Sequence, residues 1–494
     1  MVVYNSTRGA EESVQASYAI VKGLASDGGL FVPSEIPTLD IELSSMLDMT
    51  YQEVAYEVMS RFYSDFTKEE LMYCITSAYD DKFDTPIIAP VVKKGAFHYL
   101  ELFHGSTIAF KDMALSILPY LMKVASKKMK LENDIVILTA TSGDTGKAAL
   151  AGFADVAGTK IIVFYPKDGV SPIQKHQMLT QKGDNTFVVG IDGNFDDAQN
   201  GVKAIFNDTN YKKKLSEHGY QFSSANSINI GRLIPQVAYY VYAYLSMVKS
   251  GDITLGESIN VTVPTGNFGN ILAAYYAKNM GLPFNQLICA SNDNKVLYDF
   301  INTGTYDRRR DFILTSSPSM DILISSNLER LIYEITDMNP KSTRDMMTDL
   351  VRNGYYHIDE EMQHNLINFY GNFADDEETY TAIKEVFTET NYLLDPHTAV
   401  GYSVAKKYGS ETNDSKKMLI VSTASPYKFT KSVMHAIDAT YDSKDDFELV
   451  KDMETLSKVS LPRAVSEILG AKVLHKTECK SSEMIKVINE YLGI

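Results

Sequence analysis

The feature that most constrains the fold is a run of alternating strand and helix patterns that begins near residue 134. IVILTA (135–140) is typical of a short buried strand, SGDTG of a turn, 147–156 of a helix and KIIVFYP (160–166) of the next strand. A unit of this kind joins two parallel strands by a right-handed crossover. Other segments with the same alternation are 186–207, 259–291 and the residues that follow 418. The sequence therefore predicts an α/β fold, whose binding residues gather at the carboxyl ends of strands.

Size and composition narrow the class of protein. The chain has 494 residues, enough for two or three domains. Its net charge is −16, from 47 bases and 63 acids, and no basic block stands out, so we expect no nucleic-acid partner. The N-terminal residues lack the pattern of a secretory signal or transit peptide, and the longest apolar stretch, 233–248, is too short and polar to span a membrane. We expect a cytoplasmic protein without a membrane partner.

The three cysteines point away from a disulfide framework and from a metal site. Cys74, Cys289 and Cys479 stand far apart in the sequence, without the paired spacing of zinc ligands. This usage is typical of a reducing compartment. We therefore expect no bound metal.

One lysine occupies an unusual position in the stretch ELFHGSTIAFKD (101–112). Apolar residues recur every three or four positions over 110–121, which predicts an amphipathic helix with Lys111 just inside it. The turn 105–107 offers a capping hydroxyl, and Pro119 should kink or shorten the helix.

The chemistry of Lys111 has two interpretations. Beside an apolar stripe the amine is partly desolvated, which lowers its pKa and makes it a nucleophile and base able to form a Schiff base with an aldehyde cofactor. The alternative is a surface lysine that extends its amine to water, which is the commoner case. The stretch by itself favours the second.

Two glycine-containing segments are candidate anion sites. GNFGN (266–270) follows a strand and opens a helix, so its backbone N–H groups could hold a phosphate. It lacks the third glycine of a dinucleotide fingerprint, and a plain tight loop explains it equally well. SGDTGK (142–147) is similar to a Walker A loop, but Thr141 stands at its first glycine position and Ala148 follows Lys147. It is either an anion site at a helix N-terminus or an ordinary capped turn.

A third candidate is NSINIGR (226–232), which groups amides, a hydroxyl and one guanidinium. Arginine suits bidentate recognition of phosphate. A loop with one exposed arginine is the alternative, and the segment alone favours it.

Seven segments of the chain belong together: 4–9 (YNSTRG), 23–33 (GLASDGGLFVP), 101–112 (ELFHGSTIAFKD), 139–146 (TATSGDTG), 226–232 (NSINIGR), 264–270 (PTGNFGN) and 422–429 (STASPYKF). Together they resemble the threonine synthase family, enzymes that depend on pyridoxal 5′-phosphate (PLP) and belong to the tryptophan-synthase-β-like superfamily (fold type II). They stand in the family's order and cover nearly the whole chain.

The resemblance implies a tryptophan-synthase-β-like α/β fold with two α/β domains that contain parallel sheets. It also implies an N-terminal, mostly helical domain over 1–95 and a PLP-dependent catalytic region over 96–494. Within that region we expect a smaller α/β domain over about 133–227, with the larger domain formed by the remainder. The site should lie between the two. We expect a monomer.

The resemblance also assigns roles to residues. Lys111 would hold PLP as a Schiff base and act as the catalytic lysine. The other residues expected to contact PLP are Asp144, Gly266, Asn267, Phe268, Gly269, Asn270 and Thr423. The residues expected to bind substrate are Thr107, Ser142, Thr145, Asn226, Ser227 and Arg232. Thr423 would donate to the pyridine nitrogen, which makes a weaker electron sink than an aspartate would. His397 could either support its loop or take part in the chemistry.

The implied activity converts O-phospho-L-homoserine and water to L-threonine and phosphate by γ-elimination and β-addition, the last step of threonine biosynthesis. Three alternatives compete. Threonine dehydratase or cysteine synthase would share the lysine and the glycine loop, but is not expected to carry 4–9, 23–33 or the 226–232 set. A relative that only binds a small molecule would break a motif, and none is visibly broken. A nucleotide-binding protein is disfavoured by the imperfect Walker A pattern.

Overall fold

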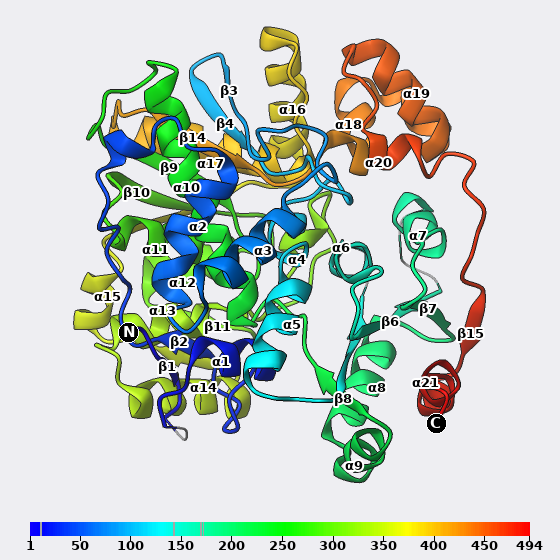
Figure 1. The fold of residues 1–494 in the computed structure, drawn as a ribbon. Coiled ribbons are helices and arrows are strands. Elements are labelled where there is room, and N and C mark those ends of the chain that lie inside the picture. Colours follow the sequence, from blue (N-terminus) through cyan, green and yellow to red (C-terminus); the bar gives the residue numbers. More distant parts are fainter. Residues whose placement is uncertain (10–11, 142–143, 168–169, 171) are drawn as a thin grey trace.

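The structure is a computed structural model, and it describes residues 1–9, 12–141, 144–167, 170 and 172–494. It contains a six-stranded sheet and a five-stranded sheet, together with two small two-stranded sheets. Figure 1 shows the two larger sheets on opposite sides of the molecule, with α4 (Asp112–Leu115), α5 (Leu118–Lys128) and α6 (Asp144–Phe153) between them. The predicted α/β class is confirmed.

The N-terminal region is mostly helical, as predicted. Thr50 and Thr67 begin its two longer helices with capping boxes, in which each hydroxyl accepts a backbone N–H and a glutamate three residues later reaches back. The buried face of α2 packs against α10. The elements are β1 (Tyr4–Ser6), α1 (Ala16–Lys22), β2 (Phe31–Pro33), α2 (Tyr51–Phe62), α3 (Lys68–Ala78) and, further along the chain, α10 (Ile230–Lys249).

The larger sheet has the strand order β13-β10-β9-β14-β4-β3, parallel except for the β3–β4 hairpin. Its strands are β3 (Val91–Lys94), β4 (Phe97–Glu101), β9 (Ile259–Pro264), β10 (Phe284–Ser291), β13 (Phe369–Phe373) and β14 (Met418–Ser422). Alternate residues of β14 belong to two different hydrophobic clusters. Leu419 and Val421 lie in the cluster that includes α10, and Ile420 lies in the cluster on the other face of the sheet. Both faces are covered, which is why these strands read as continuous apolar runs.

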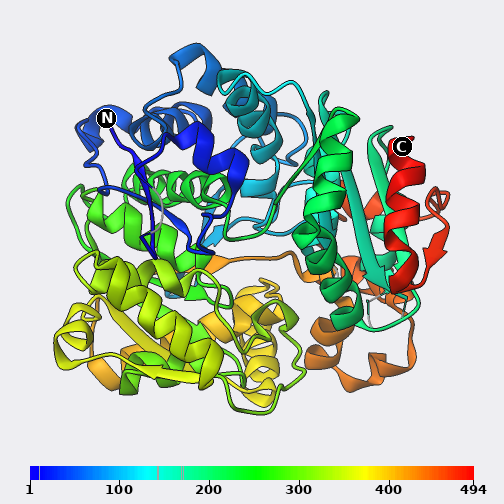
Figure 2. The ribbon, with the colours of Figure 1, turned by 90° about the horizontal axis from the view of Figure 1, so that it is seen from below.

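The smaller sheet is parallel throughout, with the order β15-β7-β6-β5-β8. Its strands are β5 (Asp134–Ala140), β6 (Thr159–Pro166), β7 (Thr186–Ile191), β8 (Tyr220–Ser223) and β15 (Thr477–Cys479). One face is covered by α8 (Phe195–Asn207), α9 (Thr209–Glu217) and α21 (Met484–Leu492). In Figure 2 the C-terminal helix α21 lies beside this sheet. β15 was not predicted.

The expected domain boundaries remain predictions, and two observations bear on them. Strands β3 and β4 pair as a hairpin across residue 95. The edge strand β15 belongs to the smaller sheet although it lies far outside 133–227.

The helix predicted over 110–121 is broken into α4 and α5, as Pro119 suggested. Proline near the start of α5 costs no hydrogen bond, because the first N–H groups of a helix have no partner in the helix. The prediction that a hydroxyl of the turn 105–107 caps this helix is wrong. Lys111 is the N-cap residue of α4, and no side chain caps this helix. The hydroxyl of Thr107 instead donates to Asp112 Oδ1 at 2.6 Å.

The remaining elements lie mainly in 296–412, for which the sequence provided no clear prediction of helices or strands, and near the C-terminus. They are α7 (Pro172–Leu179), α11 (Gly269–Asn279), α12 (Val296–Thr303), β11 (Thr305–Asp307), α13 (Leu328–Ile335), α14 (Pro340–Arg352), β12 (Tyr355–His357), α15 (Glu360–Asn365), α16 (Asp376–Thr390), α17 (Pro396–Thr412), α18 (Thr430–Ile437), α19 (Asp446–Ser457) and α20 (Arg463–Ser466). Across the described ranges, no helix is both long and apolar enough to cross a bilayer.

Candidate functional site

Lys111 stands at the carboxyl end of the larger sheet, where β4 and β14 run side by side. The segment that follows β4 pairs with the segment that follows β14: Phe110 N–H donates to Thr423 O at 2.8 Å, and Ser425 N–H donates to Ile108 O at 3.0 Å. The parallel pairing of β4 with β14 brings these two loops together. The expected neighbours Lys111 and Thr423 are therefore close, although about 310 residues separate them in the chain.

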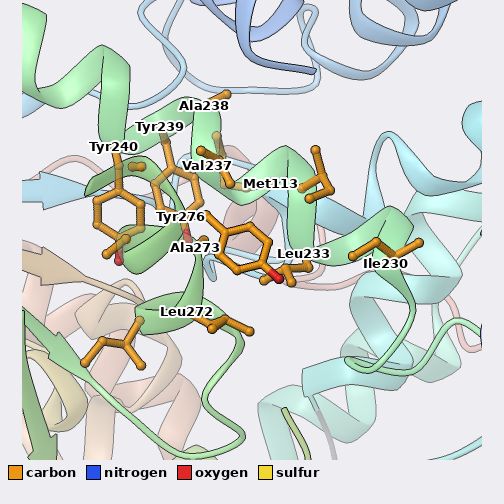
Figure 3. Close-up of a cluster of buried hydrophobic side chains, with 14 of the residues drawn as sticks. Met113, Ile230, Leu233, Val237, Ala238, Tyr239, Tyr240, Leu272, Ala273 and Tyr276 are labelled. Carbon is orange, nitrogen blue, oxygen red and sulfur yellow. The ribbon is translucent and has the colours of Figure 1, made fainter. Parts of the chain in front are cut away.

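The helix behind Lys111 is fixed by an apolar cluster. Figure 3 shows Met113 of α4 beside Ile230 and Leu233 of α10, with Leu272 and Tyr276 of α11 in the same cluster. All five side chains are buried. This packing holds the backbone from which Lys111 extends.

The side chain of Lys111 is largely buried, with 11% of its surface exposed. Its Nζ lies 3.2 Å from Asp144 Oδ2 and 3.4 Å from Ser319 Oγ. Burial lowers the pKa of Lys111; the carboxylate of Asp144 opposes this effect, and the charges of Lys428 and Arg232 add to it. The interpretation as an exposed surface lysine is excluded, and the amine has the character of a nucleophile or base.

Asp144, the first residue of α6, accepts from four donors. Oδ2 receives Lys111 Nζ and, at 3.0 Å, Ser319 Oγ. Oδ1 receives Gln174 Nε2 at 2.7 Å and lies 3.0 Å from Lys428 Nζ. Burial would raise the pKa of Asp144, but the charges of Lys428 and Lys111 outweigh it and hold the pKa well below its usual range. Asp144 is thus an ionised carboxylate with both oxygens satisfied.

Sequence reasoning missed three of these donors. Lys428 lies inside the recognised segment 422–429 but was given no role. Ser319 lies in a stretch without strand or helix periodicity, and Gln174 lies on α7 with no motif around it. Only Lys428 carried a signal, because it stands in the recognised segment that follows the buried strand β14.

His397 supports the loop that carries Ser319. Its Nδ1 lies 2.8 Å from Asp395 Oδ1, and its Nε2 accepts the backbone N–H of Ser319 at 3.1 Å. Asp395 also caps α17 through the N–H groups of His397 and Thr398. An imidazole held in this way places the Ser319 hydroxyl next to Lys111, so of the two roles considered for His397 the geometry favours support.

The glycine loop forms an open helix N-terminus. Phe268, the N-cap residue of α11, has a left-handed backbone (φ +62°) and makes no side-chain cap. The carbonyls of the loop are fixed from behind: Ser325 Oγ donates to Gly266 O at 2.7 Å, and Asn327 Nδ2 donates to Asn267 O at 2.9 Å. An N-terminus without a side-chain cap, with its carbonyls turned away, suits an anion.

The two glycines differ in their surroundings. A Cβ on Gly266 would lie 2.6 Å from Ser319 O, whereas a Cβ on Gly269 would approach nothing closer than Asn327 Nδ2 at 3.5 Å. Asn270 is buried, and its side-chain oxygen accepts from the hydroxyls of Tyr239 and Tyr240. Its side-chain oxygen therefore serves the core between α10 and α11, while its Nδ2 has no hydrogen-bond partner in the described part of the chain.

Arg232 is a buried cation, with 4% of its surface exposed. Its Nη1 donates to Ala225 O at 2.8 Å, and its Nε has no hydrogen-bond partner in the described part of the chain. Burial lowers the pKa of Arg232 to about 10. No ion pair within the described ranges involves it, so this guanidinium lacks a countercharge. A buried cation of this kind is a natural partner for an anion.

Hydroxyls and an amide connect the Arg232 segment to the glycine loop. Ser227 Oγ lies 3.2 Å from Ser326 Oγ, which donates to Asn267 Oδ1 at 3.2 Å. Asn226 is exposed at the edge of this group. The structure thus brings together Ser227 and Asn267, which the sequence assigned to two separate motifs, through the hydroxyl of Ser326.

Thr107 is fully buried and already engaged by the protein. Its N–H and hydroxyl both donate to Asp112, at 2.8 and 2.6 Å, and its carbonyl accepts from Lys428 Nζ at 2.8 Å. Its hydroxyl proton is therefore not available to a substrate, and Thr107 contributes by positioning Lys428.

The other candidate residues lie at the ends of β5 and β14. Thr145 is half-buried in the first turn of α6, next to Asp144. Thr423 is 5% exposed at the end of β14. Ser142, the remaining residue expected to bind substrate, lies outside the described residues.

Comparisons with known proteins agree on the family. Three family descriptions match: "Threonine synthase N terminus" over residues 3–79, "Pyridoxal-phosphate dependent enzyme" over 85–424 and "Threonine synthase, C-terminal" over 398–474. "Threonine synthase-like 1" from Homo sapiens is 40% identical over 443 residues, 86% of this chain; the chain spans only 59% of that longer protein. "Threonine synthase" from Schizosaccharomyces pombe is 37% identical over 473 residues, covering 89% of this chain and 90% of the relative. The crystal structure of PLP-bound threonine synthase from Brucella melitensis matches with a TM-score of 0.88 at 34% identity, over 100% of this chain and 99% of that one.

Proposed function

Because this chain belongs to the threonine synthase family, we propose that it converts O-phospho-L-homoserine and water to L-threonine and phosphate. The observation that carries the proposal is Arg232, a buried guanidinium without a countercharge and with an unpartnered Nε. The charge of Arg232 lowers the pKa of Lys111, so an anion bound by the guanidinium would lie near the reactive amine. A substrate that carries a phosphate ester fits this arrangement.

The cofactor is PLP, and the residues at the site fit it. The uncapped N-terminus of α11 would hold its phosphate through the backbone of Gly266, Asn267, Phe268, Gly269 and Asn270. Lys111 would hold its aldehyde carbon, Thr423 would donate to its ring nitrogen, and Asp144 would lie near the ring. When bound, PLP withdraws electrons and thereby stabilises negative charge on the substrate carbons.

The residues of the chain divide the remaining work. Lys111 Nζ, which burial favours as a neutral amine, is the group that we assign to remove protons from the α and β carbons and to return them. Asp144 and Ser319 fix the position of that amine. The four donors around the carboxylate keep Asp144 ionised. Asp144 therefore orients Lys111 without competing for the protons of the substrate.

The substrate would be held at both of its acidic ends. We assign its phosphate to Arg232, with Ser227 and Asn226 beside it. We assign its carboxylate to the N-terminus of α6, at Thr145 and, from the sequence, Ser142. The net charge of the chain is −16, so two local anion sites of this kind are needed to attract such a substrate.

The test is to measure phosphate and L-threonine formed from O-phospho-L-homoserine by the chain with added PLP. Equal molar amounts of both products support the proposal, and Lys111→Ala should abolish both. A chain that deaminates L-threonine or L-serine but releases no phosphate would instead be a threonine dehydratase, and the proposal would be wrong.

A further inference from the structure

Lys428 is a second buried lysine in the candidate site, and it has been given no role of its own in the reaction. Its side chain is 0% exposed. Its Nζ lies 3.0 Å from Asp144 Oδ1 and donates to Thr107 O at 2.8 Å. A buried ammonium is costly unless it is paired and hydrogen-bonded, and Asp144 and Thr107 meet both needs.

The backbone holds Lys428 in this place. Directly after β14 the chain makes one 3₁₀ turn, Pro426–Lys428, in which Ser425 accepts the backbone N–H of Tyr427 and that of Lys428. The same segment is paired with the residues before Lys111, through Ser425 N–H and Ile108 O. Both lysines are thus anchored to one piece of structure, and Asp144 reaches them from α6.

Two lysines therefore share one carboxylate, each on a different oxygen. If Asp144 faced Lys111 alone, the ion pair would favour the charged form of Lys111, which is the wrong form for a nucleophile or base. With Lys428 on the other oxygen, the negative charge of Asp144 is already balanced by a positive charge. The charge of Lys428 lowers the pKa of both Lys111 and Asp144.

We propose that Lys428 is a positioning residue that acts as the fixed countercharge of Asp144 and so leaves the amine of Lys111 able to lose its proton. This rests on the assignment of Lys111 as the lysine that holds PLP. The role of Lys428 explains how Asp144 can lie next to Lys111 without holding that lysine in its charged form.

Other charged groups face this trio from the neighbouring elements. Arg232 of α10 acts on Lys111, and His397 of α17 acts on Asp144. Asp112 of α4 and Lys147 of α6 interact with Lys428. All four stay unchanged in the variants below, so their effects cancel when the variants are compared.

The experiment follows the capture of PLP by the full-length chain, freed of cofactor, as a function of pH. Only the neutral amine attacks an aldehyde, so the midpoint of the pH–rate profile reports the protonation of Lys111. Lys428→Met should move the midpoint to higher pH and slow capture near pH 7 roughly tenfold or more, since one pKa unit changes the neutral fraction about tenfold. Lys428→Arg keeps the charge and should keep the midpoint near that of the parent.

The double variant Lys428→Met with Asp144→Asn separates the charge role from a structural one. Without either charge, Lys111 again faces a neutral pair of groups, and the midpoint should return toward that of the parent. Asp144→Asn alone leaves Lys428 uncompensated and should move the midpoint to lower pH, so it provides the measurement if Lys428→Met does not fold. An unchanged midpoint in Lys428→Met, or a rise in Asp144→Asn, would overturn the proposal.

The outcome is independent of the substrate. If the midpoints shift as expected but no phosphate is released from O-phospho-L-homoserine, the proposed function fails and the role of Lys428 stands. If threonine is formed and the midpoints do not move, only the role of Lys428 fails.

Discussion

At the scale of single residues, Arg232 is a buried cation for which the described part of the chain provides no countercharge. Its Nη1 donates to Ala225 O and its Nε has no partner among the described residues, although the side chain is almost completely buried. Burying a cation in this way costs stability unless a ligand completes it. Under the proposed function, the doubly charged phosphate of the substrate would be that ligand.

Arg232→Ala should therefore impair only the phosphorylated substrate. Removing one partner of a desolvated charged pair costs about 2–5 kcal/mol, so kcat/KM for O-phospho-L-homoserine should fall about 30-fold to several-thousand-fold. Slow deamination of L-serine or L-threonine, which lack the phosphate, should hardly change, and neither should the absorbance of bound PLP. Steady-state kinetics on both substrate types decides the matter, and an equal loss on both would make Arg232 structural.

Glu334 on α13 provides a stability test outside the site. Burial raises the pKa of Glu334 from 4.5 to about 7. Between these two values the folded state keeps a proton that the unfolded state has lost, so this residue makes stability fall as pH rises through that window. Glu334→Gln should stabilise the protein at pH 8 by about 1–3 kcal/mol, and the gain should vanish near pH 4.5. Thermal unfolding at both pH values measures it, and the exposed Glu389→Gln is the control that should show no such pH dependence.

At the scale of elements, the N-terminus of α11 is the part of the glycine loop that suits an anion. Its first turn has no side-chain cap, and the left-handed Phe268 turns the chain sharply into the helix. A left-handed non-glycine residue is strained, and such strain is commonly found at ligand sites. The loop is held from behind by Ser325 and Asn327 rather than from the side where the ligand would bind.

Gly269→Ala tests this element. Its Cβ would meet protein atoms only at ordinary contact distances, so the fold should be retained, with a change in unfolding free energy of roughly 0.5 kcal/mol or less. If backbone N–H groups bind the PLP phosphate here, the methyl group should weaken PLP affinity, measured by titration of the visible absorbance. Gly266→Ala is the matched contrast, because its Cβ would collide with Ser319 O and should disturb the fold as well as the site. An unchanged titration curve for Gly269→Ala would show that the PLP phosphate does not bind at the N-terminus of α11.

At the scale of the whole molecule, the smaller sheet is completed by the far end of the chain. β15 pairs with β7, and α21 buries Met484, Val487 and Ile488 in the core of that sheet. The smaller sheet carries α6 and hence Asp144, so the stability of the C-terminal segment supports the geometry around Lys111.

Two isoleucines on α21 allow this dependence to be measured. Ile488 is 0% exposed and Ile485 is 37% exposed. Ile488→Asp should cost about 3–5 kcal/mol, because it places a charge in an apolar core, whereas Ile485→Asp should cost about 0.5 kcal/mol or less. Thermal unfolding compares them, and PLP affinity should fall only in the first. Equal melting temperatures would show that α21 contributes little to the smaller sheet.

The sequence predicted strands better than it predicted the neighbours of the site. The strands expected over 135–140 and 160–166 lie within one residue of their observed bounds, because each is a clear apolar run. The meeting of Lys111 with Thr423 followed from family resemblance, since no local pattern reports which strands pair. Ser319 was missed because its position depends on His397, 78 residues away, and not on any period of its own. β15 was missed because three residues are too few to show alternation.

The order in which a ribosome makes the chain gives the β15 pairing a further meaning. From Ser223 to Thr477 the chain adds about 250 residues, which takes roughly 10–50 s at about 5–20 residues per second. Throughout that interval β7 has an open edge, and the apolar face that α21 will cover is exposed to water. Open strand edges and exposed apolar surface invite pairing with other nascent chains. The edge of the sheet that supports Asp144 is thus covered only after the last strand of the larger sheet has been synthesised.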